Sequence, residues 1–297
     1  MKISVLLVLL GAITPMVFLI AAIILDRQRR RNIEKPPQSE KLLRPPGYSL
    51  SIWLDENADK TLDDMFISCG LSAMAGVFVW ILAFSLSHHA PFLWWAVPAV
   101  VLVLFIIAGG MAAVRAFRGY QAAQDIRLGL RGEQAVAEAL GEAAEYGFRT
   151  FHDLQTNKVG NIDHVAVGTR GVFVIETKAR RKRDGNNGQA AHEVLYDGVT
   201  LQFPRGRDAE PIEQAKRNAA WLSNYLRHET GDPVEVLPVV VLPGWFVKIS
   251  AKGNFRVRVV NAKYLPRFLQ QQAKKIEPAQ VRRVITALDK KCRDVEF

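Results

Sequence analysis

Hydrophobic residues divide this chain into two dissimilar parts. Up to residue 117 they form three long apolar runs, at 3–25, 65–87 and 92–117, interrupted mainly by Gly, Ser and Thr. Each run reaches the roughly 20 residues that an α-helix needs to cross a bilayer. Beyond residue 118 the apolar positions come in short stretches between polar turns, as in a folded domain. The pattern predicts three transmembrane helices followed by a domain at 118–297.

The first run and the segment after it have different characters. Residues 1–25 hold an apolar run too long for an ordinary signal peptide, without a clear small-x-small cleavage site, so we expect a retained signal anchor. Residues 26–64 are polar and contain Pro36-Pro37 and Pro45-Pro46-Gly47. We expect a connector there with little fixed structure beyond a short element at 48–54, followed by a two-helix transmembrane hairpin at 65–117.

The domain shows alternating helical and strand patterns. Helical spacing is found at 128–146, and Pro211 stands where a first helical turn favours proline. The expected elements are a helix at 128–146, strands at 147–153, 162–168 and 171–177, a small hairpin at 193–203, a helix at 211–227, strands at 234–242 and 255–260, and helices at 263–274 and 278–290. The order α-β-β-β-α-β predicts a three-layer α/β core.

The strands at 162–168 and 171–177 are predicted to form a hairpin with a charged patch. Thr169-Arg170 is a two-residue turn between glycines, so residue 168 faces residue 171. In that register Asp163 lies opposite Glu176, with Cβ atoms roughly 5 Å apart. Lys178 lies two residues beyond Glu176 and therefore on the same face. The hairpin gathers two carboxylates and one ammonium group.

Facing carboxylates repel each other, and one tends to take up a proton. Mg²⁺ or Mn²⁺ removes this conflict, because these ions prefer oxygen ligands. A lysine beside such an ion can orient a bound water and help to deprotonate it, which suits hydrolysis of a phosphodiester. The alternative is a solvated strand end, in which Lys178 only neutralises Asp163 and Glu176.

Several short motifs, in this order, resemble the NERD (nuclease-related) domain of the PD-(D/E)xK nuclease superfamily. They cover roughly residues 128–245, and only Asn161, where a glutamine is expected, departs from the pattern. The motifs are Arg131-Gly132-Glu133, Phe151-His152-Asp153-Leu154, Ile162-Asp163-His164, Gly171-Val172-Phe173-Val174-Ile175-Glu176-Thr177-Lys178 and Pro211-Ile212-Glu213-Gln214.

This resemblance implies a restriction-endonuclease-like core and a role for each motif. It implies that Asp163 and Glu176 bind the metal ion and that Lys178 positions the water. Glu133 would bring a further carboxylate to the metal, and Gln214 would bond to phosphate or to metal-bound water. The alternatives are an exposed helix glutamate and an ordinary polar residue of a first helical turn.

Two other residues near these motifs are weaker candidates. His164 adjoins Asp163, so strand alternation points it to the opposite face, where we expect a packing role. Asp153 ends the first strand, and we do not expect it to be a ligand.

The net charge of +10 has two sources. Part consists of arginines that flank the apolar runs. Another part is a basic run directly after the predicted site, and we expect it to contact phosphates of nucleic acid. The alternatives are a mobile basic loop and one that touches anionic lipid. The expected contacts are Arg180, Arg181, Lys182 and Arg183.

The same arginines predict the topology. Basic residues cluster after the first run and after the third, whereas the turn at 88–91 has no lysine or arginine. The positive-inside rule then places the N-terminus outside and the domain in the cytoplasm, in a multi-pass protein of a cell membrane such as a bacterial inner membrane. Cys69 and Cys292 show no metal-ligand spacing and are not expected to pair, which is typical of a reducing compartment.

The predicted function is a membrane-anchored nuclease that uses Mg²⁺ or Mn²⁺ on the cytoplasmic side. Its expected partners are nucleic acid, with DNA favoured over RNA, and the lipid bilayer. A second hypothesis is a non-catalytic module that tethers nucleic acid at the membrane. A third assigns the function to the spans, as a platform or sensor, because their apolar centres contain no charged residue and so do not suit an ion pathway.

Overall fold

The computed structural model describes residues 41–89, 95–156, 160–182, 192–250, 253 and 255–295. The chain divides into two compact units. The described residues of the first unit are mainly 55–89 and 95–124, and the second unit comprises residues 38–54 and 125–297. The expected span at 3–25 and Arg183 both lie outside the described residues.

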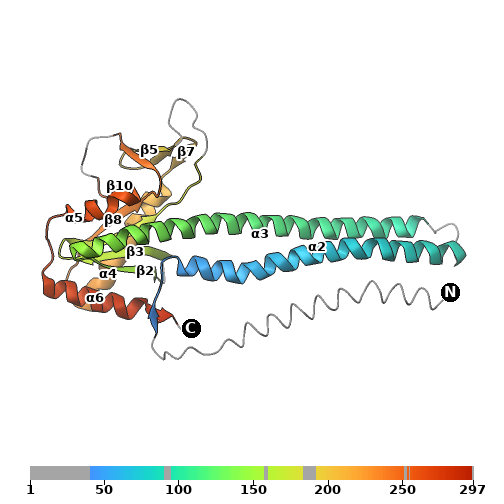
Figure 1. The fold of residues 1–297 in the computed structure, drawn as a ribbon, viewed down its shortest axis with the longest axis horizontal. Helices are drawn as coiled ribbons and strands as arrows, with labels where there is room; N and C mark the ends of the chain where they lie inside the picture. The colour runs from blue at the N-terminus through green and yellow to red at the C-terminus, as the bar shows by residue number, and fades with distance from the viewer. Residues whose placement is uncertain are drawn as a thin grey trace. The chain divides into compact units, whose positions relative to one another are not determined.

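The first unit is built from residues 55–89 of helix α2 (Tyr48–His89) and residues 96–124 of helix α3 (Ala96–Ala143) (Figure 1). They lie side by side, since Ser68 Oγ donates to the carbonyl of Gly109 at 3.1 Å and the rings of Phe78 and Phe105 are 6.1 Å apart. Both are long and apolar enough to cross a membrane, and few of their apolar side chains are buried. In the part of the chain that the structure describes there are thus two candidate spans, against three expected.

Both helices are longer than the sequence pattern predicts. Residues 48–64 are helical instead of loosely structured, because α2 begins at Tyr48. The expected third span and the expected helix at 128–146 are parts of one helix, α3. The intervening residues 118–127 contain no proline and are rich in Ala, Gln and Arg, which favour helix continuation.

The second unit is organised around a five-stranded sheet of order β10-β8-β4-β3-β2. Strand β4 pairs in parallel with β8 and antiparallel with β3, and Gly168 faces Gly171 as predicted. The hairpin register is therefore confirmed. The strands are β2 (Arg149–Gln155), β3 (Asn161–Gly168), β4 (Gly171–Thr177), β8 (Val236–Val241) and β10 (Arg258–Val260).

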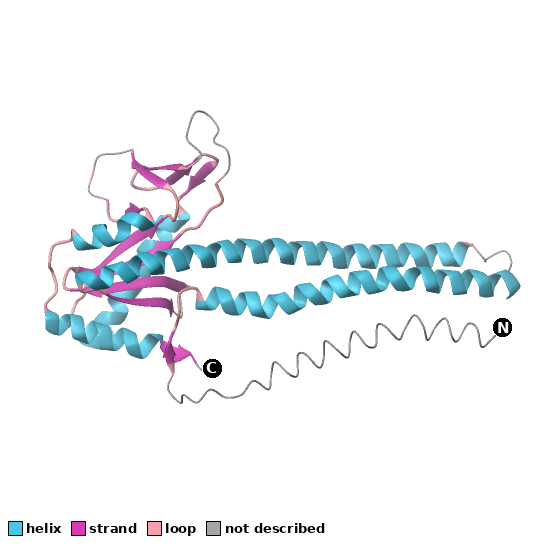
Figure 2. Ribbon diagram, in the orientation of Figure 1, coloured by secondary structure: helices cyan, strands magenta, loops and turns pink. Residues whose placement is uncertain are grey.

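Helices cover both faces of this sheet (Figure 2). On one face α4 (Glu210–Thr230) and α6 (Pro278–Cys292) pack against residues such as Val165 and Val174. On the other face the end of α3 and α5 (Leu265–Gln270) pack against residues such as Phe173. Strand β4 is apolar throughout its centre because both of its faces are covered. The mixed α/β class is confirmed.

Smaller elements complete this unit. The predicted hairpin at 193–203 is part of a sheet of order β7-β6-β5-β9, of which strands β7 and β9 were not predicted. Its strands are β5 (Glu193–Tyr196), β6 (Leu201–Phe203), β7 (Gly206–Asp208) and β9 (Phe246–Ile249). The remaining short elements are β1 (Leu42–Leu43), which pairs with β11 (Arg293–Val295), η1 (Ala144–Tyr146) and η2 (Ala262–Tyr264).

Candidate active site

Two carboxylates of the β3–β4 hairpin form the centre of the candidate site. Glu176 lies near the end of β4 and is 4% exposed, while Asp163 occupies the facing position of β3 and is half-buried. A side-chain oxygen of Asp163 accepts a hydrogen bond from the amide of Thr177 at 2.6 Å. This bond fixes the Asp163 carboxylate at the end of β4, next to Glu176.

Helix α3 brings a third carboxyl group to this strand end. Glu133 is 9% exposed, the charge of Asp163 acts on it, and its own charge acts on Glu176. The approach is close because Gly132 has no side chain: a Cβ atom there would lie 2.6 Å from that of Ala179. The glycine therefore sets how near α3 comes to the segment after β4.

Burial and mutual repulsion raise the pKa of all three carboxyl groups. Burial and then the charges of Asp163 and Asp153 raise the pKa of Glu133 to about 8, while a bond from the Gly47 amide opposes the rise. Burial raises the pKa of Asp163 to about 7, although the bond from the Thr177 amide and the charge of Lys178 both lower it. Burial and then Asp163 hold the pKa of Glu176 well above its ordinary value. Such a group needs a proton or a cation to be stable.

Lys178 supplies a positive charge beside these acids. Its amide donates to the carbonyl of Val241 at 3.0 Å, so the chain after β4 still follows β8. Its ammonium group opposes the rise in the pKa of both Asp163 and Glu176. The structure thus brings together Glu133, Asp163, Glu176 and Lys178, four of the five residues expected at the site.

The fifth expected residue, Gln214, is half-buried in the first turn of α4, and Asn218 on the next turn contacts Glu176 instead. Asn218 is fully buried, its Nδ2 donates to Glu176 Oε2 at 3.3 Å, and its Oδ1 has no hydrogen-bond partner among the described residues. Positions 214 and 218 share a helix face, because residues four apart are neighbours. That spacing was the available sequence signal for Asn218, which was not predicted as a site residue.

Asp153 has a structural role. Its φ of 49° is unusual for a residue other than glycine. Its Oδ2 accepts from both the amide and the hydroxyl of Ser49 at 2.7 Å, and its Oδ1 accepts from Asn161 at 3.0 Å. Asp153 therefore caps the N-terminus of α2, and the amide of Asn161 serves that cap.

His164 packs against another histidine. Its Nδ1 lies 2.8 Å from that of His152, and the ring of His164 is fully buried. Burial lowers the pKa of His152 to about 4, and burial together with His152 holds the pKa of His164 well below its ordinary value. Both rings are neutral at physiological pH, as suits the packing role expected for His164.

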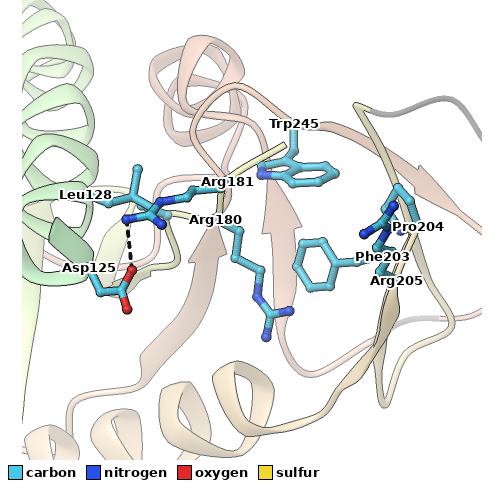
Figure 3. Close-up of a pocket in the computed structure, with 9 residues that line it drawn as sticks. Asp125, Leu128, Arg180, Arg181, Phe203, Pro204, Arg205 and Trp245 are labelled. Atoms are coloured by element: carbon cyan, nitrogen blue, oxygen red, sulfur yellow. Dashed lines mark ion pairs between the residues drawn. The ribbon is translucent and has the colours of Figure 1, made fainter. Parts of the chain in front are cut away.

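The basic run after β4 lies along a pocket (Figure 3). Arg180 is paired with Asp208 and lies over the ring of Phe203 at 4.3 Å, and Arg181 forms an ion pair with Asp125 at 3.0 Å. Lys182 is exposed. Two of the four expected nucleic-acid contacts therefore already have acidic partners.

The oxygen donors at the site suit a hard divalent cation. Among the described residues no group of three or more His, Cys, Asp or Glu side chains is arranged to hold an ion. Mg²⁺, however, is usually held by one or two carboxylates and several waters. Asp163 and Glu176 supply such a pair, and the unpartnered Oδ1 of Asn218 is a further oxygen beside it.

Comparison with known proteins finds a family model that matches part of the chain. Residues 128–243 match the family model of NERD, the nuclease-related domain. The matched stretch runs from the last turns of α3 to just beyond β8 and contains all of the residues that surround Glu176 in the site described above. No curated protein and no solved structure matches this chain.

Proposed function

We propose that the nuclease-related domain at residues 128–243 works as a metal-dependent nuclease that hydrolyses phosphodiester bonds of nucleic acid. One observation carries the proposal: Glu133, Asp163 and Glu176 meet beside Lys178, and the pKa of each carboxyl group is raised. A salt bridge that only stabilised the fold would lower the pKa of its acids. Here burial, the first cause in all three groups, outweighs the opposing effect of Lys178 on Asp163 and Glu176.

The side chains have distinct roles in this proposal. Asp163 and Glu176 hold Mg²⁺ or Mn²⁺, which when bound polarises a phosphoryl oxygen and acidifies a water. Lys178 orients the attacking water and stabilises negative charge on the phosphate. Asn218 fixes the Glu176 carboxylate, and Gln214 bonds to phosphate from the preceding turn. Glu133 carries a proton near neutral pH because its pKa is raised to about 8.

The architecture supports a restriction-endonuclease-like core in this proposal. A helix precedes the antiparallel strands β2, β3 and β4, and α4 leads to the parallel strand β8. The acids lie at the end of the central strand β4, where helices from both faces of the sheet reach them.

We further propose that the apolar parts of α2 and α3, with residues 3–25, anchor the protein in a membrane. The support is the exposure of large apolar side chains, such as Ile106 at 63% and Phe117 at 60%. The arginines that follow the runs favour an outer N-terminus and a domain on the cytoplasmic side. Nucleic acid, DNA in preference to RNA, would then be the substrate within reach.

The test is cleavage of labelled DNA and RNA by the full chain, purified in detergent, with Mn²⁺. Asp163→Asn and Lys178→Met should each lower the rate by about 100-fold or more, as removal of a group that stabilises the transition state does. Glu138→Gln is the control, because Glu138 is an exposed acid on the helix that carries Glu133. Cleavage that survives both site substitutions would refute the proposal.

A second candidate function is metal-independent tethering of nucleic acid, favoured by the arginine-lined pocket after β4. Binding would then fall steeply with salt and be insensitive to metal. Affinity measured with and without Mg²⁺, and for Glu176→Gln, separates the two. If chelation and the substitution both abolish binding, the tethering hypothesis is wrong.

A further inference from the structure

A pocket of about 370 Å³ lies beside the candidate active site. Its walls come from α3, from the segment after β4, from the β6–β7 turn and from the chain before β9 (Figure 3). The volume lies in the range of small-molecule sites. The lining residues are Asp125, Leu128, Ala179, Arg180, Arg181, Phe203, Pro204, Arg205 and Trp245.

The pocket and the carboxylates share a wall. Ala179 lines the pocket and packs against Gly132, the residue before Glu133. Arg181 stands three residues after Lys178, a distance of at most about 10 Å along the chain. A strand with one phosphate at Lys178 can therefore place a neighbouring nucleotide in the pocket.

The pocket is positively charged, and two of its arginines can bind a ligand. Three guanidinium groups line it, from Arg180, Arg181 and Arg205. The partner of Arg181, Asp125, is 72% exposed, and such surface ion pairs contribute only about 0–1 kcal/mol. Arg205 is exposed on the β6–β7 turn. A guanidinium group matches the geometry of phosphate, so Arg181 and Arg205 suit a phosphate ligand.

The remaining wall suits a planar group with a hydrogen-bond acceptor. Phe203 and Trp245 meet edge to face, with ring centroids 5.1 Å apart. The Trp245 side chain is buried, and its Nε1 has no hydrogen-bond partner among the described residues. Figure 3 draws this nitrogen on the side of the ring toward Arg180 and Arg181. A buried N–H without a partner costs about 1–3 kcal/mol, which an acceptor on a ligand would recover.

We propose that this pocket holds one unpaired nucleotide of the substrate strand. Arg181 and Arg205, which stand on opposite sides of the pocket in Figure 3, would contact the phosphates on either side of this nucleotide. Its base would lie beside Leu128 at the Nε1 edge of Trp245 and accept a bond from Nε1. This inference rests on the proposed function for the identity of the strand, and it adds the substrate class. A nucleotide of a duplex must leave the stack to enter a pocket, at a cost of a few kcal/mol. Single strands and unpaired ends are therefore the preferred substrates.

The first experiment measures binding without cleavage. The full chain in detergent with EDTA is titrated against labelled oligothymidylate and against a blunt duplex of equal length, with fluorescence anisotropy as the readout. The single strand should bind about tenfold or more tightly, because it pays no unstacking cost. Equal dissociation constants for the two probes would overturn the inference.

Variants locate the effect in the pocket. Trp245→Phe keeps the aromatic wall and removes the donor, so single-strand affinity should fall about 3- to 10-fold, the worth of one hydrogen bond. Arg205→Ala should weaken single-strand binding by at least as much. Arg207→Ala is the matched control, because Arg207 is exposed in the adjoining strand and does not line the pocket. If Arg207→Ala and Arg205→Ala have equal effects, binding is general electrostatics and the inference is wrong.

Further measurements separate a folding defect, a phosphate site and a failure of the nuclease proposal. Thermal melting checks that each variant folds. If Trp245→Phe does not fold, Arg205→Ala on the exposed turn still tests the pocket. Thymidine monophosphate should compete far better than inorganic phosphate, and equal competition would overturn the nucleotide assignment. Cleavage with Mn²⁺ is scored independently. If the protein prefers single strands but does not cleave them, the pocket assignment is supported and the nuclease proposal is wrong. If it cleaves nucleic acid without preferring single strands, the nuclease proposal is supported and the pocket assignment is wrong.

Discussion

Asn218 Nδ2 donates a hydrogen bond of 3.3 Å to Oε2 of Glu176, across 42 residues of sequence. Both side chains are buried. The bond joins α4 to the end of β4, so the orientation of the candidate ligand Glu176 depends on a helix whose Arg217 also acts electrostatically on that carboxyl group.

Substituting Asn218 tests that dependence. Asn218→Ala should weaken activation by Mn²⁺ about 10- to 100-fold, as loss of a group that orients a metal ligand does. The measurement is the Mn²⁺ concentration that gives half-maximal cleavage. Asn224→Ala, at an exposed position of the same helix, is the control. Equal activation of the two variants would show that Asn218 does not orient Glu176.

The raised pKa of the acids predicts how stability depends on pH. The pKa of Glu133 rises from 4.5 to about 8 and that of Asp163 from 3.8 to about 7, so the folded state binds more protons than the unfolded state in between. The stabilisation is complete below about pH 4 and is lost as pH rises through 7 and 8. The apparent melting temperature of the metal-free chain should therefore fall between pH 6 and pH 9.

Glu133→Gln should make this fall in melting temperature smaller, because the amide has no proton to lose and only the other acids still titrate. Each kcal/mol corresponds to about 2–4 °C in melting temperature for a domain of this size. Glu138→Gln should leave the dependence as it is. A melting temperature that rises from pH 6 to pH 9 would contradict the assignment of these acids.

Mn²⁺ should restore the melting temperature that the protein loses at high pH. The ion needs ionised carboxylates, so its binding competes with protons at Asp163 and Glu176. At a concentration 100 times its dissociation constant a ligand stabilises a fold by about 2.7 kcal/mol. The rise in melting temperature on adding Mn²⁺ should be larger at pH 8 than at pH 6, and absent in Asp163→Asn.

Asp153 should matter for stability more than for chemistry. Asp153→Ala removes the cap of α2 and should cost about 1–2 kcal/mol. Asp153→Asn keeps an acceptor oxygen and tolerates a positive φ, so its melting temperature should lie closer to the original. A fall in cleavage for Asp153→Asn without any change in melting temperature would give Asp153 a role in the reaction.

The topology is tested by reporter fusions. A reporter active only in the cytoplasm, fused to Phe297, should be active, and one active only outside should be active in the 88–91 turn. These outcomes follow from the arginines after residues 25 and 114. Two silent fusions would mean that the orientation is inverted.

Local sequence was sufficient for the hairpin and its charges. Two glycines around Thr169-Arg170 determine the turn, the turn determines the register, and the register brings Asp163 to Glu176. The strand patterns of β2, β3, β4 and β8 were clear because their apolar residues are continuous or alternate regularly.

Long-range packing accounts for what was missed. Asn218 reaches Glu176 only because α4 docks on β4, and the Asp153 cap depends on Ser49, 104 residues earlier. Gln214 was the visible motif residue, but which turn of a helix faces a strand follows from packing and not from spacing alone. Strand β9 is four residues long and carries too little pattern to be recognised.

Gly132 and Ala179 are so close that there is no room for a methyl group between them. A Cβ atom at position 132 would sit 2.6 Å from that of Ala179, closer than two carbon atoms approach, so even alanine would push the helix away from the strand end. Glu133 travels with that helix, whereas Asp163 and Glu176 stay with the hairpin. The spacing between Glu133 and the two hairpin acids therefore depends on a residue that has no side chain, and a substitution at position 132 would change the site without replacing any of its acids.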